Sequence, residues 1–515
     1  MCGIVGFTGR ENALPILIKG LYSLEYRGYD SAGVAAFTKD GLRVVKARGR
    51  IANLEEKIKE EGGDMYCTCG IGHTRWATHG EPSDRNSHPH LGGKGKVAVV
   101  HNGIIENYKE LRERLEAHGY EFKSETDTET VAHLVDYLHT GKQEDLAKTV
   151  LQAVQRLRGS YALGVVSMDN TQEIVAARRG NPLVIGIGEG ENMIASDITA
   201  IINRTKRYII LDDNEVAIVR PDSVVVMNEF GDTVEKEIMT VTWDMSAAEK
   251  GGYQHFMLKE IMEQPKAVAD TVKPRIKNDA VVFEDNGLTD ERLREIEHIH
   301  IIGCGSALHA GMVGKRVIEA MCRIRCTAEV ASEFRYENPI IGKKDMCIVI
   351  SQSGETADTL AAMRLAKQAG AFTIAIVNVV SSTIAREADG VLYTWAGPEI
   401  SVATTKAYSA QLSALYLISV KIARVRGLIS IGDERALCAE LQRLPECIEQ
   451  TLKCQSDMQR IATLYANRSS VFFLGRGLDY AAALEASLKL KEISYIHSEA
   501  YAAGELKHGT ISLIE

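Results

Sequence analysis

The chain has 515 residues, of which 45% are hydrophobic and 25% are charged, and its 69 acidic and 60 basic residues give a formal charge of −9. This length allows roughly two to four domains, and the acidic balance gives no electrostatic reason to expect nucleic-acid or anionic-membrane binding. No apolar run approaches the ~18 residues of a membrane span, and the N-terminus lacks the basic flank of a signal peptide.

Cysteine usage indicates a reducing compartment. Ten cysteines are spread along the chain without a regular framework, and Cys67-x-Cys69 lacks the second pair of a zinc site. We therefore expect a cytoplasmic protein that uses no cofactor: no metal, because no ligand cluster is apparent, and no dinucleotide, because Leu308 replaces the third glycine after Gly303-x-Gly305.

The first 240 residues alternate short strands with a few helices. Period-two alternation and bounding glycines predict strands over 2–7, 31–38, 42–47, 67–72, 96–100, 161–167, 173–177, 183–187, 215–219 and 223–227. Helical patterns cover 13–25, 107–118, 128–139 and 144–157. Many strands in direct succession predict stacked antiparallel sheets covered by helices.

Residues 241–290 are charged, contain Gly251-Gly252 and two prolines, and predict a linker with one lead-in helix over 255–262. Between 291 and 430 the order becomes strand, loop, helix. Strands are expected over 298–302, 346–350, 373–377 and 391–394, and a long helix over 407–424. This alternation predicts a doubly wound parallel sheet.

The same pattern restarts at residue 470 and predicts an internal repeat, with a second copy over 455–515. Ser470–Leu474 leads into Gly475-Arg476-Gly477 and a helix through Leu490, and Ser498-Glu499 is aligned with Ser332-Glu333 of the first copy. The first copy uses about 130 residues for its sheet, whereas the second has about 45, so the second domain is expected to be truncated.

Cys2 is the first residue with a chemical interpretation. If Met1 is removed, Cys2 carries both its thiol, with a reference pKa of about 8.5, and an α-amine of about 7.7–8.0. The amine can accept the thiol proton directly or through one water, so nucleophile and base lie on one residue. The alternative is an ordinary small residue after an initiator methionine.

Three further places carry groups that such a nucleophile would need. Arg75-Trp76 is either a bidentate carboxylate binder beside a large ring or a solvated arginine beside a packed tryptophan. Asn102-Gly103 is either a hairpin turn or a pair of oxyanion donors. Asp127 either caps the helix that follows it or binds an ammonium group.

The segments 1–6, 24–33, 73–80 and 101–106 together resemble class II glutamine amidotransferases of the N-terminal-nucleophile hydrolase type. The resemblance implies an α-β-β-α sandwich in which Cys2 attacks the glutamine amide while Asn102 and Gly103 hold the oxyanion. It further implies that glutamine binds through its carboxylate, its ammonium group and neighbouring contacts to Arg75, Asp127, Thr78 and His79, and that Trp76 gates the path of the released ammonia.

The second half carries three candidate features. The loop Ser351–Thr356 lies between a strand and a helix and can cradle a phosphate, cap the helix, or do both. Glu485, Lys489 and Glu492 share one helix face, either as a surface ion-pair ladder or as a carboxylate that moves a proton beside a cation. His508 lies in a loop that we expect to be exposed; a lone loop histidine usually has no function, but the reference pKa of histidine, about 6.5, suits opening a sugar ring.

These features, with the segments 303–311, 331–336, 351–360, 401–406 and 488–509, resemble the paired sugar-isomerase domains of the glutamine–fructose-6-phosphate aminotransferase family. The resemblance implies a homodimer that converts fructose 6-phosphate and glutamine to glucosamine 6-phosphate and glutamate, with ammonia passing through a channel. In it, Glu492 moves the C1/C2 proton, Lys489 assists, and His508 opens the ring from the neighbouring subunit. The implied phosphosugar contacts are Ser306, Ser351, Gln352, Ser353, Thr356, Val402 and Thr404.

Two departures from the family modify this expectation. Ala307 replaces a second hydroxyl residue at the sugar site, and the family continues beyond residue 515 to a lysine that forms a Schiff base with the ketose. We therefore expect glutaminase activity but little amino-sugar synthesis from these 515 residues. The alternatives are a fructosamine-phosphate deglycase, an amidotransferase with another acceptor, and a non-catalytic phosphosugar-binding regulator, which the joint presence of Cys2, Glu492 and His508 disfavours.

Overall fold

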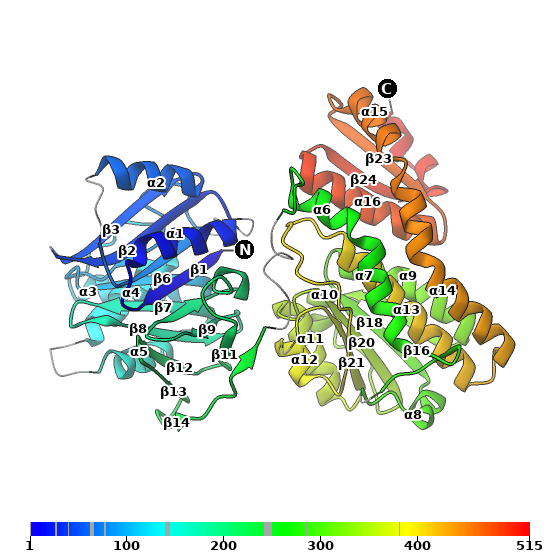
Figure 1. The fold of residues 1–515 in the computed structure, drawn as a ribbon, viewed down its shortest axis with the longest axis horizontal. Coiled ribbons are helices and arrows are strands. Elements are labelled where there is room, and N and C mark those ends of the chain that lie inside the picture. The colour runs from blue at the N-terminus through cyan, green and yellow to red at the C-terminus, as the bar shows by residue number, and fades with distance from the viewer. Residues whose placement is uncertain are drawn as a thin grey trace. The chain divides into compact units, whose positions relative to one another are not determined.

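The computed structural model describes residues 2–25, 28–39, 41–61, 66–76, 79–139, 145–241, 250–284, 286–380 and 382–514. The chain forms two compact units, Met1–Met245 (unit 1) and Ser246–Glu515 (unit 2), whose elements are labelled in Figure 1. Within the described parts of the chain, no helix is both long and apolar enough to cross a membrane.

Unit 1 is built on two antiparallel sheets. In sheet order, the first consists of β15 (Met239–Thr240), β11 (Arg207–Ile210), β9 (Val184–Ile187), β10 (Asn192–Ala195), β1 (Gly3–Thr8), β4 (Cys69–Arg75), β2 (Ser31–Thr38) and β3 (Gly41–Arg48). The second consists of β14 (Thr233–Val234), β13 (Ser223–Met227), β12 (Val216–Arg220), β8 (Asn170–Arg179), β7 (Gly159–Ser167), β6 (Val97–Ile105) and β5 (His90–Leu91).

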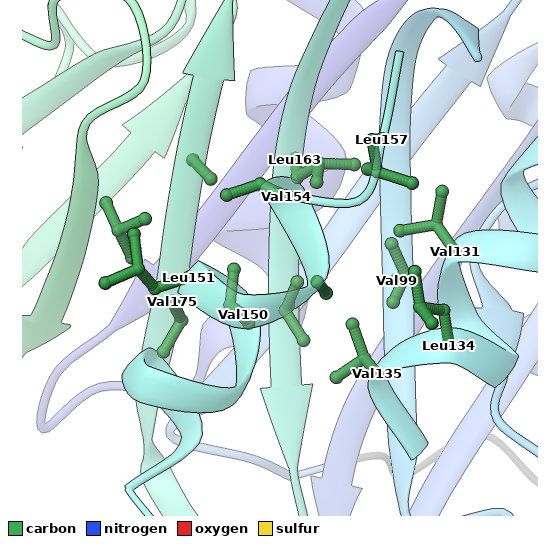
Figure 2. Packing of buried hydrophobic residues seen from close by; sticks show 14 of the residues in the cluster. Val99, Val131, Leu134, Val135, Val150, Leu151, Val154, Leu157, Leu163 and Val175 are labelled. Atoms are coloured by element: carbon green, nitrogen blue, oxygen red, sulfur yellow. The ribbon is translucent and has the colours of Figure 1, made fainter. Parts of the chain in front are cut away.

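Helices cover the outer face of each sheet. The first sheet carries α1 (Ala13–Leu24) and α2 (Ile51–Glu60), and the second carries α3 (Tyr108–Ala117), α4 (Asp127–Leu138) and α5 (Leu146–Val154). Figure 2 shows Val131 of α4 and Val150 of α5 packed against the second sheet. Ile4, Ile71 and Val100 are fully buried between the two sheets, and full burial of such side chains contributes roughly 1.5–3 kcal/mol each. The α-β-β-α sandwich is confirmed.

The local signal at Asn102-Gly103 was misleading, because these residues form no turn. They lie inside β6, which continues to Ile105 and pairs Gly103 with Tyr161 of β7. Gly103 has φ +135°, and a Cβ there would lie 2.1 Å from the carbonyl oxygen of Ser160. Glycine is therefore required at this position by close strand approach and backbone conformation.

Unit 2 contains a five-stranded parallel sheet in the order β19 (Arg325–Val330), β18 (His298–Gly303), β20 (Asp345–Ser351), β21 (Phe372–Val377) and β22 (Gly390–Tyr393). One face carries α9 (Ser306–Cys322) and α13 (Lys406–Val425), and the other carries α10 (Ala331–Tyr336), α11 (Ala357–Gln368) and α12 (Thr383–Glu387). The doubly wound sheet is confirmed. Strand β19 lies on one side of β18, and the later strands β20, β21 and β22 are added on the other side. The topological switch point therefore lies between β18 and β20, where such folds bind ligands.

Much of the segment expected to be a linker belongs to unit 2. It forms α6 (Phe256–Met262), α7 (Gln264–Val272), β16 (Ile276–Lys277), β17 (Ala280–Val281) and the start of α8 (Asp290–Glu295). The Thr271 hydroxyl donates to the Thr394 carbonyl, and Lys406 Nζ lies 2.7 Å from Glu263 Oε2. Two further helices, α14 (Ile431–Leu452) and α15 (Gln455–Tyr465), precede the repeat and were not predicted.

The second copy of the repeat comprises β23 (Ser470–Gly475), α16 (Leu478–Ser494) and β24 (His497–Ala502). Its parallel pairing of Ser470 with His497 reproduces the pairing of His298 with Arg325 in the first copy, and Tyr495 and Arg323 end the two helices with positive φ. This register corrects one sequence alignment. Ser498-Glu499 lies within β24, and Glu505, not Glu499, is the counterpart of Glu333.

Candidate active site

A cavity of about 320 Å³ in unit 1 brings together predicted residues from four separate segments. It is lined by seven of the predicted glutaminase residues: Cys2, Arg75, Trp76, His79, Asn102, Gly103 and Asp127. The pairing of Gly3 with Thr74 sets Cys2 beside the end of β4, and β6 carries Asn102 across the sandwich. Met1 and Thr78 lie outside the described residues.

The Cys2 thiol lies against the backbone of Trp76. The Trp76 N–H donates to Cys2 Sγ at 3.3 Å, and the Trp76 indole packs edge-on against Tyr29 with ring centroids 5.4 Å apart. Burial raises the pKa of the Cys2 thiol, while the hydrogen bond from Trp76 opposes this rise. The thiol therefore needs a base to become a nucleophile, which is the role expected of its own α-amine.

The side chain of Asn102 is oriented by His73, a residue to which sequence analysis assigned no role. His73 Nε2 lies 2.9 Å from Asn102 Oδ1, and Asn102 Nδ2 donates to the Cys2 carbonyl at 3.0 Å. Burial lowers the pKa of His73 to about 3, so the ring is neutral. Because the amide oxygen only accepts, Nε2 carries the proton, and the amide nitrogen faces Cys2.

Arg75 is buried and lines the cavity. Its guanidinium donates to the carbonyls of His79, Gly80 and Glu81 and so organises the loop that carries His79. Burial lowers the pKa of Arg75, while the nearby carboxylates of Asp30 and Asp127 raise it. A guanidinium keeps its charge under these conditions, so the cavity contains a fixed cation suited to a carboxylate.

Asp127 is not the helix cap. Thr126 occupies the cap position of α4 and accepts the Glu129 N–H, whereas Asp127 is the first residue of the helix. Its Oδ2 accepts the Ile105 N–H at 2.8 Å, and the side chain is 4% exposed. The capping alternative is therefore wrong, and Asp127 supplies a buried negative charge that lines the cavity.

In unit 2, the hydroxyl groups of the loop after β20 form hydrogen bonds within the loop. Ser351 Oγ accepts the Gly354 N–H at 3.0 Å and lies 3.0 Å from Thr356 Oγ1, while Ser353 Oγ accepts the Glu355 N–H. Thr356 occupies the cap position of α11, yet among the described groups its hydroxyl accepts no hydrogen bond from the helix. The first N–H groups of α11 thus remain available to an anion at the switch point.

The row Glu485, Lys489 and Glu492 on α16 is not a simple surface ladder. Lys489 pairs with both carboxylates, but Glu485 is buried and accepts from Ser306 Oγ at 2.7 Å and His309 Nδ1 at 2.8 Å, both on α9. The ladder therefore joins the two copies of the repeat. The hydroxyl of Ser306, which was expected to contact the sugar, donates its hydrogen bond to Glu485.

The remaining sugar-site candidates lie on exposed or polar loops. Val402 is exposed, and the hydroxyl of Thr404 donates to Glu399. His508 is exposed in the turn after Glu505, as expected. Parallel strands direct their carboxyl ends to one edge, so the loops after β18, β20 and β22 share the edge at which Ser351 lies.

Glu260 of α6 holds the loop Ile400–Lys406. Its Oε1 accepts the backbone N–H groups of Ile400 at 2.5 Å and Ser401 at 3.1 Å. Burial raises the pKa of Glu260 from about 4.5 to about 7, with Glu399 adding to the rise. The folded state therefore binds this proton more tightly than the unfolded state does.

We expect the stability of unit 2 to fall as pH rises from about 4.5 to about 7, because the contribution of protonated Glu260 is lost through its folded-state pKa. Glu260→Gln should flatten this dependence in thermal unfolding followed by calorimetry between these pH values. Glu297→Gln, at an exposed position paired with Lys344, should retain it. Parallel profiles for wild type and Glu260→Gln would contradict the assignment.

Comparisons with known proteins match both units. A glutamine amidotransferase domain model matches residues 73–203, and a SIS domain model matches residues 292–421 and 464–515. A Caldanaerobacter subterraneus protein named glutamine--fructose-6-phosphate aminotransferase (isomerizing) is 55% identical over 516 residues, covering 100% of this chain and 84% of the relative. A Clostridium tetani protein of the same name is 54% identical with the same coverage.

A solved structure also resembles part of the chain. It is the C-terminal domain of glucosamine-fructose-6-phosphate aminotransferase from Francisella tularensis, with 39% identity and a TM-score of 0.51. The alignment covers 52% of this chain and 75% of that chain.

Proposed function

Since this chain belongs to the glutamine–fructose-6-phosphate aminotransferase family, we propose that its two units divide one reaction between them. Unit 1 hydrolyses glutamine to glutamate and ammonia. Unit 2 joins the ammonia to fructose 6-phosphate and isomerises the product to glucosamine 6-phosphate. The observation that carries the proposal is the cavity of unit 1, in which a thiol, an amide donor, a cation and a carboxylate converge.

In unit 1, Cys2 Sγ attacks the amide carbon of glutamine after its proton passes to the α-amine. The amide oxygen becomes an oxyanion, which accepts hydrogen bonds from Asn102 Nδ2 and the Gly103 N–H. Collapse of this intermediate expels ammonia and leaves a thioester, which water hydrolyses to glutamate. Every bond change then occurs at one carbon, so a fixed oxyanion site serves both steps.

Substrate binding in unit 1 follows from the two opposite charges of the cavity. Arg75 binds the α-carboxylate of glutamine, and Asp127 binds its α-ammonium group, with Thr78 and His79 completing the contacts. The side-chain amide is then directed at Cys2. Trp76, half-exposed above the thiol, gates the departure of ammonia.

In unit 2, the hydroxyls of Ser351, Ser353 and Thr356, the Gln352 side chain and the N-terminus of α11 bind the sugar phosphate. Glu492 transfers a proton between C1 and C2 of the aminated sugar, and Lys489 forms an ion pair with this carboxylate. The other proposed participants in the sugar site are Ser306, Val402, Thr404 and the ring-opening His508.

His508 acts across a homodimer interface in this proposal, because its exposed turn is free to enter a neighbouring sugar site. We place the enzyme in the cytoplasm. All ten cysteines lie in the described residues as free thiols, including the exposed Cys447 and Cys454, as suits a reducing compartment.

The test is an assay of the protein expressed from its native gene, so that any coding sequence after residue 515 is included, supplied with fructose 6-phosphate and glutamine labelled with ¹⁵N in the side-chain amide. We expect equal amounts of glutamate and of glucosamine 6-phosphate that carries the label. Glutamate release without amino sugar would contradict the role of unit 2. Amino sugar without the label would contradict the coupling of the two units.

A further inference from the structure

Three side chains of the kinds that bind metals meet at the amino-terminal edge of the unit 2 sheet. His298 and His300 alternate along β18 and therefore face the same side. Asp345, the first residue of β20, is the direct pairing partner of His298. One ligand atom from each side chain lies within 4.8 Å of the others. Among the described residues, these three side chains are the group of histidine, cysteine and acidic residues close enough together to hold a metal ion.

The two histidines leave nitrogen atoms unsatisfied toward this group. His300 is 4% exposed, and its Nδ1 lies 3.2 Å from Glu329 Oε1 and 3.1 Å from the Thr327 hydroxyl. Because an ionised carboxylate only accepts, Nδ1 carries the proton and Nε2 holds a lone pair. That Nε2, like Nε2 of His298, is buried without a hydrogen-bond partner among the described residues.

Two unsatisfied nitrogens at one place require an explanation. A buried polar atom without a partner destabilises the folded state, and the rings of His298 and His300 lie with centroids only 4.0 Å apart. Nε2 of His300 presents a lone pair, and Nε2 of His298 presents one in the tautomer that is protonated at Nδ1, so a cation held between the two rings satisfies both nitrogens. The carboxylate of Asp345 adds the negative charge that such a cation requires.

We propose that His298, His300 and Asp345 bind a first-row divalent metal ion of the zinc type. Two imidazoles and a carboxylate are ligands that zinc accepts, and water fills the fourth position. Glu329 is the outer carboxylate that orients the His300 ring, as in many zinc sites. Ligands of tetrahedral zinc are about 3.4 Å apart, so the three side chains close slightly around the ion.

The site is distinct from the proposed sugar site. Asp345 and Ser351 begin and end β20, and six steps of a strand separate them by roughly 20 Å. The ion would therefore tie β18 to β20 at the far edge of the sheet and stabilise unit 2 without taking part in the reaction. In the second copy, Ser470 and Phe472 replace His298 and His300, so the repeat contains one such site.

The experiment uses untagged full-length protein, stripped with a chelator and titrated with Zn²⁺ against a chromogenic competitor, and with Co²⁺ followed by visible d–d absorption. We expect one ion per chain and a rise in the melting temperature of the unit 2 transition. His300→Gln and Asp345→Asn should abolish this binding. Glu329→Gln should weaken it by about 10–100-fold, because it removes only the orienting carboxylate.

His497→Gln is the matched control. It removes an exposed histidine near Glu499 on the strand of the second copy, and it should retain full binding. Circular dichroism of the stripped variants establishes that they are folded. The proposal is overturned if folded wild-type protein binds no ion, if water alone occupies the site, or if His300→Gln and Asp345→Asn bind as tightly as wild type. None of these outcomes depends on amino-sugar synthesis.

Discussion

Cys2→Ala is expected to lower glutamine hydrolysis by at least about 10⁴-fold, because no other described thiol lines the cavity and the covalent route requires a nucleophile at this position. Glutamate release is measured by a coupled assay. Intact-mass measurement after exposure to a glutamine-like diazoketone should show one adduct on the wild type and none on Cys2→Ala.

Cys67→Ala is the control for this substitution. Cys67 lies in the same unit, and burial raises the pKa of its thiol to about 11, which makes it a poor nucleophile. This variant should retain both turnover and the diazoketone adduct. Glutamine hydrolysis by Cys2→Ala at more than a few per cent of the wild-type rate would contradict the role of Cys2, and an adduct on Cys67 would identify a different reactive thiol.

Asn102→Ala is expected to reduce kcat for glutamine hydrolysis by about 10²–10³-fold, equivalent to about 2.7–4 kcal/mol, because one donor to the oxyanion is lost. KM should change little, since Arg75 and Asp127 remain to bind the substrate. Steady-state kinetics with glutamine measure both constants. The effect falls on kcat because the donor acts on charge that develops only in the transition state.

Two companion variants sharpen this result. His73→Phe leaves the amide in place but removes the N–H that orients it, so kcat should fall by a smaller factor. Asn170→Ala removes an amide at the start of β8, where it contacts Glu173, and should leave kcat unchanged. A rise in KM with unchanged kcat in Asn102→Ala would show that Asn102 binds the ground state and does not stabilise the oxyanion.

Much of the fold followed from local sequence patterns. Strand β2 and the helices α1 and α13 were predicted to within one or two residues, because the signals for such elements lie in neighbouring residues. Helix α2 was missed, although Ile51, Leu54 and Ile58 form its buried face. Its mostly charged sequence hides this stripe, which becomes significant only against the sheet.

The site was predicted in its residues but not in its geometry. The motif resemblance led to Cys2, Arg75, Asn102 and Asp127, which the fold brings to one cavity. The cap role of Thr126 and the orienting role of His73 were not predicted. The motif around His73 was recognised, but nothing in it indicates that His73 contacts a residue 29 positions away.

The sequence alone determined the elements and the chemical inventory of this protein, because helix and strand periodicity, caps and reactive groups depend on residues close together in the chain. The tertiary structure decided what those groups contact. Packing of α16 against α9 buried Glu485. Long-range strand pairing placed Asn102-Gly103 inside β6 and brought Asp345 to His298 and His300. Such pairings depend on burial and register across the whole sheet, which no local segment of the sequence contains.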